Sequence, residues 1–122
     1  MSDCHAIVID NLPLTPDFEA LLQREVERAV WALEAAKADP RTADACTIKI
    51  RRIMLAVQDV ALRCDYPLVA ALCASACRLI DSDRTDSGQQ RGLREHLHAL
   101  RNIVIANLQD RSYDGQAAAT AA

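Results

Sequence analysis

Apolar residues recur at helical spacing along most of this chain and define four amphipathic segments. A helix is predicted where hydrophobic positions return every three or four residues and so share one face. The two central segments meet at Asp65-Tyr66-Pro67, because the residue before a proline avoids helical geometry. The apolar face of the first central segment is Ile50, Ile53, Met54, Val57, Val60, Ala61 and Cys64, and that of the second is Leu68, Val69, Leu72, Cys73, Ala76, Leu79 and Ile80.

The links between the helices carry clear start and stop signals. Thr15-Pro16-Asp17 offers a capping hydroxyl, a proline at the first helical position and an acid in the first turn, which predicts a helix to about Lys37. Asp39-Pro40 repeats this signal, so the second helix begins there or, at Thr42 or Asp44, a few residues later. The third helix is predicted to end near Ile80, and the polar run 81–88 predicts a surface loop.

The last predicted helix runs from about Gln89 to Gln109. Four amphipathic helices with short links predict an all-α fold, an antiparallel four-helix bundle. We assign residues 1–14 to a short N-terminal arm with the apolar run Ala6–Ile9, residues 15–110 to the bundle, and residues 111–122 to a flexible, alanine-rich tail.

The first helix also carries surface features. Trp31 lies off the centre of its apolar stripe, so we expect it to cover an edge of the bundle. Glu27 is expected to form salt bridges with Arg24 and Arg28 along the helix face.

Composition narrows the possible functions. The 122 residues suit one domain, and a net charge of −3 with few aromatic residues disfavours nucleic-acid binding. The sequence shows no apolar run of membrane length and no cationic, apolar leader, so we expect no membrane contact and a cytoplasmic location. Five cysteines, an odd number without a leader, indicate reduced thiols.

Candidate catalytic groups are few. His5 lies in the arm, His96 lies on the inner face of the last helix where a hydrogen-bonded core or rim position is expected, and His98 lies on its solvent side. Cys73 and Cys77 are one turn apart but lack further donors at zinc-ligand spacing. No nucleophile–base spacing is recognisable, so we expect no catalytic, metal or cofactor site and no enzyme activity.

Two stretches carry a family resemblance. Cys64-Asp65-Tyr66-Pro67-Leu68-Val69, followed by Leu72-Cys73 and Cys77-Arg78-Leu79, is similar to the middle of histidine phosphotransfer (HPt) domains. In that family a helix bearing His-Asp-Ile-Lys-Gly leads into Phe-Gly-Tyr-Pro-Leu. The stretch from Glu95 to Val104 is similar to the family's last helix. The resemblance implies an HPt-like bundle and a role in two-component phosphorelay signalling.

The same resemblance places Leu55 where the family carries its phosphoacceptor histidine, Gln58 at the family lysine and Asp59 at the family glycine. A leucine has no nucleophilic nitrogen, so this position cannot carry phosphate. The resemblance therefore implies a non-catalytic adaptor that docks on a response-regulator receiver domain or a histidine kinase. The alternatives are an active phosphotransfer protein that uses His98 and a structural helical homodimer.

The spacing of aliphatic and charged residues indicates the same face of the helix, the one that carries Leu55. Leu55 lies opposite the apolar face of its helix, with Ile48 and Leu62 two turns away on either side. Exposed aliphatic residues edged by charges are typical of a docking surface. Two other interpretations are that the N-terminal arm or the first helix covers these aliphatic residues, or that a homodimer buries them. The predicted partner-binding residues are Ile48, Arg51, Arg52, Leu55, Gln58, Asp59 and Leu62.

Overall fold

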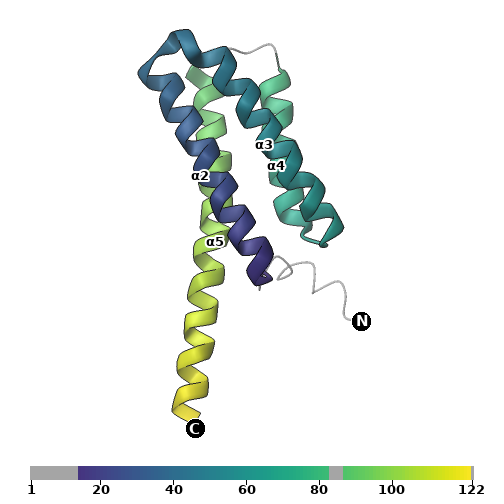
Figure 1. Cartoon of the computed structure of the whole chain (residues 1–122), viewed down its shortest axis with the longest axis vertical. Helices are drawn as coiled ribbons and strands as arrows, with labels where there is room; N and C mark the ends of the chain where they lie inside the picture. The colour runs from purple at the N-terminus through teal and green to yellow at the C-terminus, as the bar shows by residue number, and fades with distance from the viewer. Residues whose placement is uncertain (1–13, 83–86, 122) are drawn as a thin grey trace.

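The four amphipathic segments form four helices that pack side by side and run alternately up and down (Figure 1). The structure is a computed structural model that describes the backbone of residues 14–82 and 87–121 and the side chains of residues 14–82 and 88–107. Within these ranges it is all-α, as predicted, and contains no strand. The elements are α2 (Pro16–Ala38), the short 3-10 helix η1 (Pro40–Thr42), α3 (Ala43–Arg63), α4 (Pro67–Asp81) and α5 (Ser87–Ala121).

Each long helix packs against two neighbours in the bundle. Helix α3 lies between α2 and α4, and α5 closes the arrangement by packing against α4 and α2. This order follows from the short links, because consecutive helices joined by a few residues become antiparallel neighbours. Helices α3 and α5 are therefore the diagonal pair, and their outward faces lie on different sides of the molecule.

Helix α2 begins after the predicted N-cap residue, Thr15. The hydroxyl of Thr15 accepts a hydrogen bond from the backbone N–H of Phe18 at 3.3 Å, which satisfies one of the free donors of the first turn. At the other end, the Asp39 carboxylate accepts a hydrogen bond from the backbone N–H of Arg41 at 3.1 Å and so caps η1. Helix α3 begins at Ala43, in agreement with the later of the two predicted starts.

Tyr66 holds the turn between α3 and α4. Asp65 has a φ of 64°, in the left-handed region that ends a helix. The buried Tyr66 ring stacks on Phe18 with the ring centroids 4.4 Å apart, and its hydroxyl accepts a hydrogen bond from the Thr15 backbone N–H at 2.8 Å. The turn is thereby fixed against the start of α2. The sequence indicated the break at Pro67 but gave no sign of this contact.

The core is built from aliphatic side chains of all four helices. Two predicted core positions are wrong, because Cys64 is exposed and Leu68 is 48% exposed where the chain turns between α3 and α4. Trp31, predicted to cover an edge, is instead 79% exposed, since it lies opposite the buried face of α2. The largest of the fully buried side chains are those of Leu22, Val26, Ile50, Met54, Val57, Val69, Cys73, Leu93, Leu97, Leu100 and Asn107.

A buried amide links the first and last helices. Asn107 has no exposed surface, and its Oδ1 accepts a hydrogen bond from the Leu14 backbone N–H at 2.7 Å. Its Nδ2 donates to the Glu19 carboxylate at 2.5 Å. A shift of α5 along α2 would break both hydrogen bonds and leave the Asn107 amide buried and unpaired, which is costly. The two bonds therefore fix the register of α5 against α2.

Helix α5 projects beyond the other helices and carries the C-terminus (Figure 1). It ends at Ala121 rather than near Gln109, and the high helix propensity of the alanines in this segment explains the continuation. The flexibility of residues 111–122 stays a prediction. The arm with Ala6–Ile9, apart from Leu14, and the centre of the predicted surface loop lie outside the described residues.

Candidate functional site

A row of aliphatic side chains runs along the outer face of α3. Ile48, Leu55 and Leu62, each two turns from the next, are 54%, 40% and 62% exposed. The opposite side of α3 is buried in the core. These three residues, here called the aliphatic row, therefore form a strip of hydrophobic surface that faces solvent, which is the arrangement that a docking surface requires.

Arg51 ties one flank of the aliphatic row to α4. Its Nε and Nη2 atoms donate to the two carboxylate oxygens of Asp81 at 2.8 and 3.2 Å. The hydrogen bond with Arg51 lowers the pKa of Asp81 below its usual value, and the same bond raises the pKa of Arg51. The pair is open to solvent, so it contributes little to stability, but it fixes the position of the guanidinium beside the row.

The other predicted partner-binding residues also lie on the accessible side of α3. Arg52 and Asp59 are exposed, and Gln58 is half-buried. Asp59 pairs with Arg63 one turn later at 2.8 Å, whereas Arg52 forms no ion pair with a described residue. The structure thus brings all seven predicted residues together on one helix, with hydrophobic side chains along the middle and charges beside them.

His96 has a structural role between α4 and α5. Its Nδ1 lies 2.7 Å from the carbonyl oxygen of Gly92, and its Nε2 lies 2.8 Å from the Ser75 hydroxyl. Because a carbonyl oxygen only accepts, Nδ1 carries the proton and Nε2 accepts a hydrogen bond from Ser75. This confirms the hydrogen-bonded rim position predicted for His96.

His98 is exposed and lies in an open hollow on α5 beside Arg94 and Asn102. No described residue forms a hydrogen bond with its ring. The aliphatic row is on α3, the helix diagonal to α5, so the two candidate sites are separate. His5 lies outside the described residues.

Neither of the two buried cysteines of α4, Cys73 and Cys77, is an activated nucleophile. Burial raises the pKa of Cys73 to about 12 and also raises the pKa of Cys77, so both remain thiols at neutral pH. All four described cysteines are free. No group of His, Cys, Asp and Glu among the described residues is placed to hold a metal ion.

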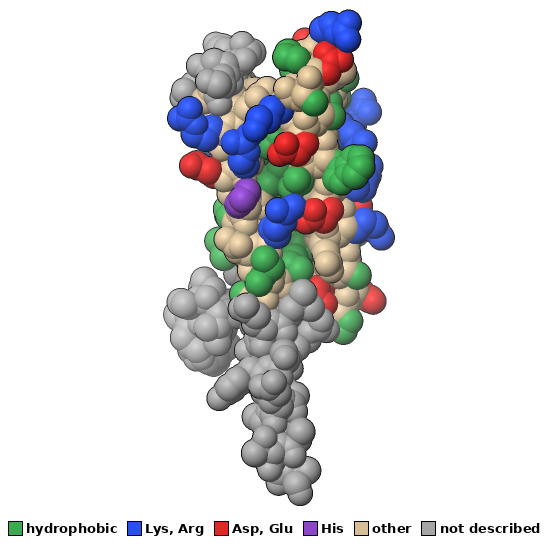
Figure 2. All heavy atoms as spheres, turned by 90° about the vertical axis from the view of Figure 1, so that its left-hand side faces the viewer, with side chains coloured by type: hydrophobic (Ala, Val, Ile, Leu, Met, Phe, Trp, Pro, Cys, Tyr) green, Lys and Arg blue, Asp and Glu red, His purple; other side chains and the backbone are tan. Residues whose placement is uncertain are grey.

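The side of the bundle formed by α2 and α5 carries many charged side chains, with hydrophobic side chains between them (Figure 2). Figure 2 shows acidic and basic side chains interspersed over this side. Arg101 on α5 donates to both carboxylate oxygens of Glu27 on α2 at 2.9 and 2.8 Å. The predicted pairing of Glu27 with Arg24 and Arg28 is wrong, because Glu27 faces α5 and the two arginines contact Glu25 instead. Mixed charges of this kind are typical of a solvated face.

Comparisons with known proteins identify no protein similar to this chain. No family model, curated protein or solved structure matches this chain. Within the part of the chain that the structure describes, no helix is both long enough and apolar enough to cross a membrane. The exposed aliphatic row of α3 therefore provides the main structural indication of function.

Proposed function

We propose that this protein is a non-catalytic adaptor in two-component phosphorelay signalling, and that its aliphatic row docks on a receiver domain or a histidine kinase in the cytoplasm. The observation that carries this proposal is the 40% exposure of Leu55, at the position where the HPt domains that this chain resembles have their histidine. An accessible side chain there can contact a partner, but leucine cannot accept a phosphoryl group. The adaptor would therefore occupy its partner without taking phosphate from it.

The neighbours of Leu55 support binding without transfer. Gln58 stands in place of the family lysine and removes a cation that would attract phosphate. Asp59 stands in place of the family glycine and adds a negative charge, which its ion pair with Arg63 at 2.8 Å only partly offsets. An acid at this position repels an incoming phosphoryl group. The three differences act in the same direction.

The aliphatic row supplies only part of the affinity that such a complex needs. Because each of its side chains is about half exposed, complete burial would contribute roughly 1 kcal/mol per residue. A micromolar complex needs about 8 kcal/mol, and a standard interface buries about 800 Å² on each partner. The partner must therefore also contact the flanking polar residues, among them Arg51 and Arg52, which would form the rim of the interface.

Calorimetric titration of this protein with purified receiver domains and histidine kinases of the same organism tests the proposal. Leu55→Arg should weaken binding by about tenfold or more, since it places a charge at the centre of the interface. Ile105→Arg is the matched control, because Ile105 is similarly exposed, at 43%, but lies on α5. Unchanged affinity of the Leu55→Arg variant, or no binding of any of these partners to the wild-type protein, would refute the proposal.

Self-association is the competing use of the aliphatic row. Sedimentation across a dilution series distinguishes it, because a homodimer dissociates on dilution and Leu55→Arg should then yield a monomer. A dimer of this kind that binds no receiver domain or kinase would contradict the adaptor function. The third possibility is active phosphotransfer through His98. It would be supported, and the adaptor function contradicted, if the wild-type protein acquired acid-labile phosphate from a phosphorylated receiver domain and His98→Gln did not.

A further inference from the structure

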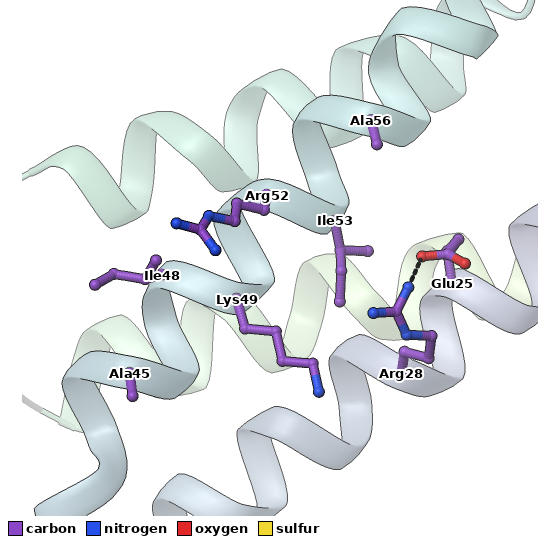
Figure 3. Close-up of a pocket in the computed structure, with 8 residues that line it drawn as sticks. All are labelled: Glu25, Arg28, Ala45, Ile48, Lys49, Arg52, Ile53 and Ala56. Carbon is purple, nitrogen blue, oxygen red and sulfur yellow. Dashed lines mark hydrogen bonds and ion pairs between the residues drawn. The ribbon is translucent and has the colours of Figure 1, made fainter.

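A second surface of α3 faces α2 rather than outward. An open groove of about 400 Å³ lies between the two helices (Figure 3). Ile53, which is buried, forms its floor together with small residues of α3. Lys49 and Arg52 of α3 and Arg28 of α2 line its sides. The groove thus combines an apolar floor with cationic sides.

The positive charge of this groove is only partly neutralised. Arg28 donates to Glu25 at 2.6 Å, but Glu25 also pairs with Arg24 at 3.0 Å, so two cations share one carboxylate. Lys49 and Arg52 form no ion pair or hydrogen bond with a described residue. In a chain with a net charge of −3, the groove is therefore a local positive surface, complementary to acidic side chains.

Trp31 lies directly beside the groove. It lines an adjoining hollow together with Glu27 and with Arg28 and Lys49, which line both cavities. At 79% it is the most exposed of the large hydrophobic side chains that the structure describes. Tryptophan and arginine are the residues that most often dominate binding energy at protein interfaces, and here they lie next to each other.

We propose that the α2–α3 groove binds an acidic segment of a partner protein that carries an aliphatic or aromatic anchor residue. The anchor packs on Trp31 and on the floor formed by Ile53, while the acidic side chains of the segment pair with Lys49 and Arg52. This inference goes beyond the adaptor function and does not depend on the HPt resemblance. The groove shares only Ile48 and Arg52 with the predicted docking residues.

Nucleic acid fits the groove less well than an acidic peptide. Trp31 is a single aromatic ring, whereas strands of bases are usually held by several stacking side chains. An apolar floor is better matched by a leucine or phenylalanine side chain than by a sugar or phosphate.

The groove has a built-in reporter, because Trp31 is the only tryptophan of the chain. The probe is a synthetic peptide that combines leucine and glutamate at helical spacing, and its control replaces each glutamate by lysine. Addition of the glutamate peptide to the full chain should shift the Trp31 emission to shorter wavelength and protect it from acrylamide quenching. The lysine peptide should have neither effect, and added salt should weaken the binding of the glutamate peptide.

Two single variants complete the test. Lys49→Glu should weaken binding of the labelled glutamate peptide by about tenfold, because an attraction becomes a repulsion. Arg78→Glu on α4 makes the same charge change at an exposed site away from the groove and should bind as the wild type does. Equal binding of both peptides, no loss in Lys49→Glu, or tighter binding of an oligonucleotide than of the glutamate peptide would overturn the inference. Leu55→Arg should not weaken peptide binding, which separates this result from the test of the adaptor.

Discussion

Introducing a histidine at position 55 tests whether α3 presents the phosphoacceptor position of the HPt domains that the chain resembles. In Leu55→His, a neutral imidazole nitrogen would attack the phosphorus of a receiver aspartyl phosphate. A nitrogen–phosphorus bond would form while the phosphorus–oxygen bond breaks and the aspartate leaves as a carboxylate. The wild-type leucine offers no such nitrogen. We therefore expect acid-labile phosphate on the variant and none at this position in the wild type.

The variant should fold, because little buried surface is lost. Complete burial of a leucine is worth about 2 kcal/mol, and Leu55 is 40% exposed, so its loss costs about 1 kcal/mol before the imidazole restores part of the contact. Adding Gln58→Lys and Asp59→Gly introduces the other two residues that HPt domains carry at the positions the resemblance aligns with Gln58 and Asp59. The glycine costs about 1 kcal/mol of helix stability, and loss of the ion pair with Arg63 costs a few tenths more. The triple variant should thus melt roughly 5–10 °C below the wild type.

The assay incubates each variant with a receiver domain labelled at its aspartate and follows acid-labile, base-stable phosphate on this protein. Transfer to the triple variant should be about tenfold faster than to Leu55→His, because the lysine stabilises the moving phosphoryl group and the acid that repels it is gone. Leu62→His is the control, since Leu62 is 62% exposed on the same row and should remain unlabelled. A triple variant that binds the receiver domain as tightly as the wild type but gains no phosphate would refute the assignment of position 55.

Three further outcomes test the fold and its titrating groups. Leu22→Ala, at a side chain with no exposed surface, should lower the free energy of unfolding in urea by about 2–5 kcal/mol, and a smaller loss would contradict the packing. In a thiol titration of the folded protein near neutral pH, the exposed Cys64 should react long before Cys73, whose pKa of about 12 keeps it protonated; similar rates would show that Cys73 is accessible. The lowered pKa of Asp81 means that its ion pair stabilises the fold above the ordinary carboxyl pKa of 3.8 and is lost as the pH falls through the lowered value. Thermal melts of Asp81→Asn and wild type should therefore differ only slightly at neutral pH and converge in acid, and a difference that persists in acid would be inconsistent with this ion pair.

Features that depend on neighbouring residues could be predicted from the sequence. The cap at Thr15 and the break before Pro67 are local signals, and both positions hold in the structure. The aliphatic row was predictable for the same reason, because its three members share one helix and only the period of α3 is needed to align them. The sequence did not predict the end of α5 correctly. Alanine occurs on both buried and exposed helix faces, so it gives no periodic signal, yet it has a high helix propensity.

Features that join distant parts of the chain could not be read from local patterns. The hydrogen bond between Thr15 and Tyr66 spans 51 residues, and that between Leu14 and Asn107 spans 93. Nothing near either residue indicates its partner. The α2–α3 groove is of the same kind, because Arg28 and Lys49 become neighbours only once the rotation of two helices about their axes is known. The exposure of Trp31 likewise depends on how α2 packs.

The distribution of exposed hydrophobic side chains is the physical basis for the docking surface proposed on α3. A single exposed leucine needs no explanation, because folded proteins carry much apolar surface. Among the described residues, however, three of the six exposed large hydrophobic side chains lie on α3, and α2, α4 and α5 carry one each. The aliphatic row lies on α3, Trp31 lies on the neighbouring α2 beside the groove, and Leu68 lies at the start of the neighbouring α4.

Helix α5, the longest of the four, contributes only Ile105 to these exposed side chains within its described part. Its contact with α2 is covered by the ion pair between Arg101 and Glu27 and by mixed charges (Figure 2). If solubility alone had shaped the surface, α3 would carry the same charges on its outward face, since exposed aliphatic rows invite aggregation. Half of the exposed large hydrophobic side chains lie on α3, the helix whose Lys49 and Arg52 also line the groove and pair with no carboxylate of the described residues. The proposed contact with another protein accounts for both properties, which packing among the described residues does not explain.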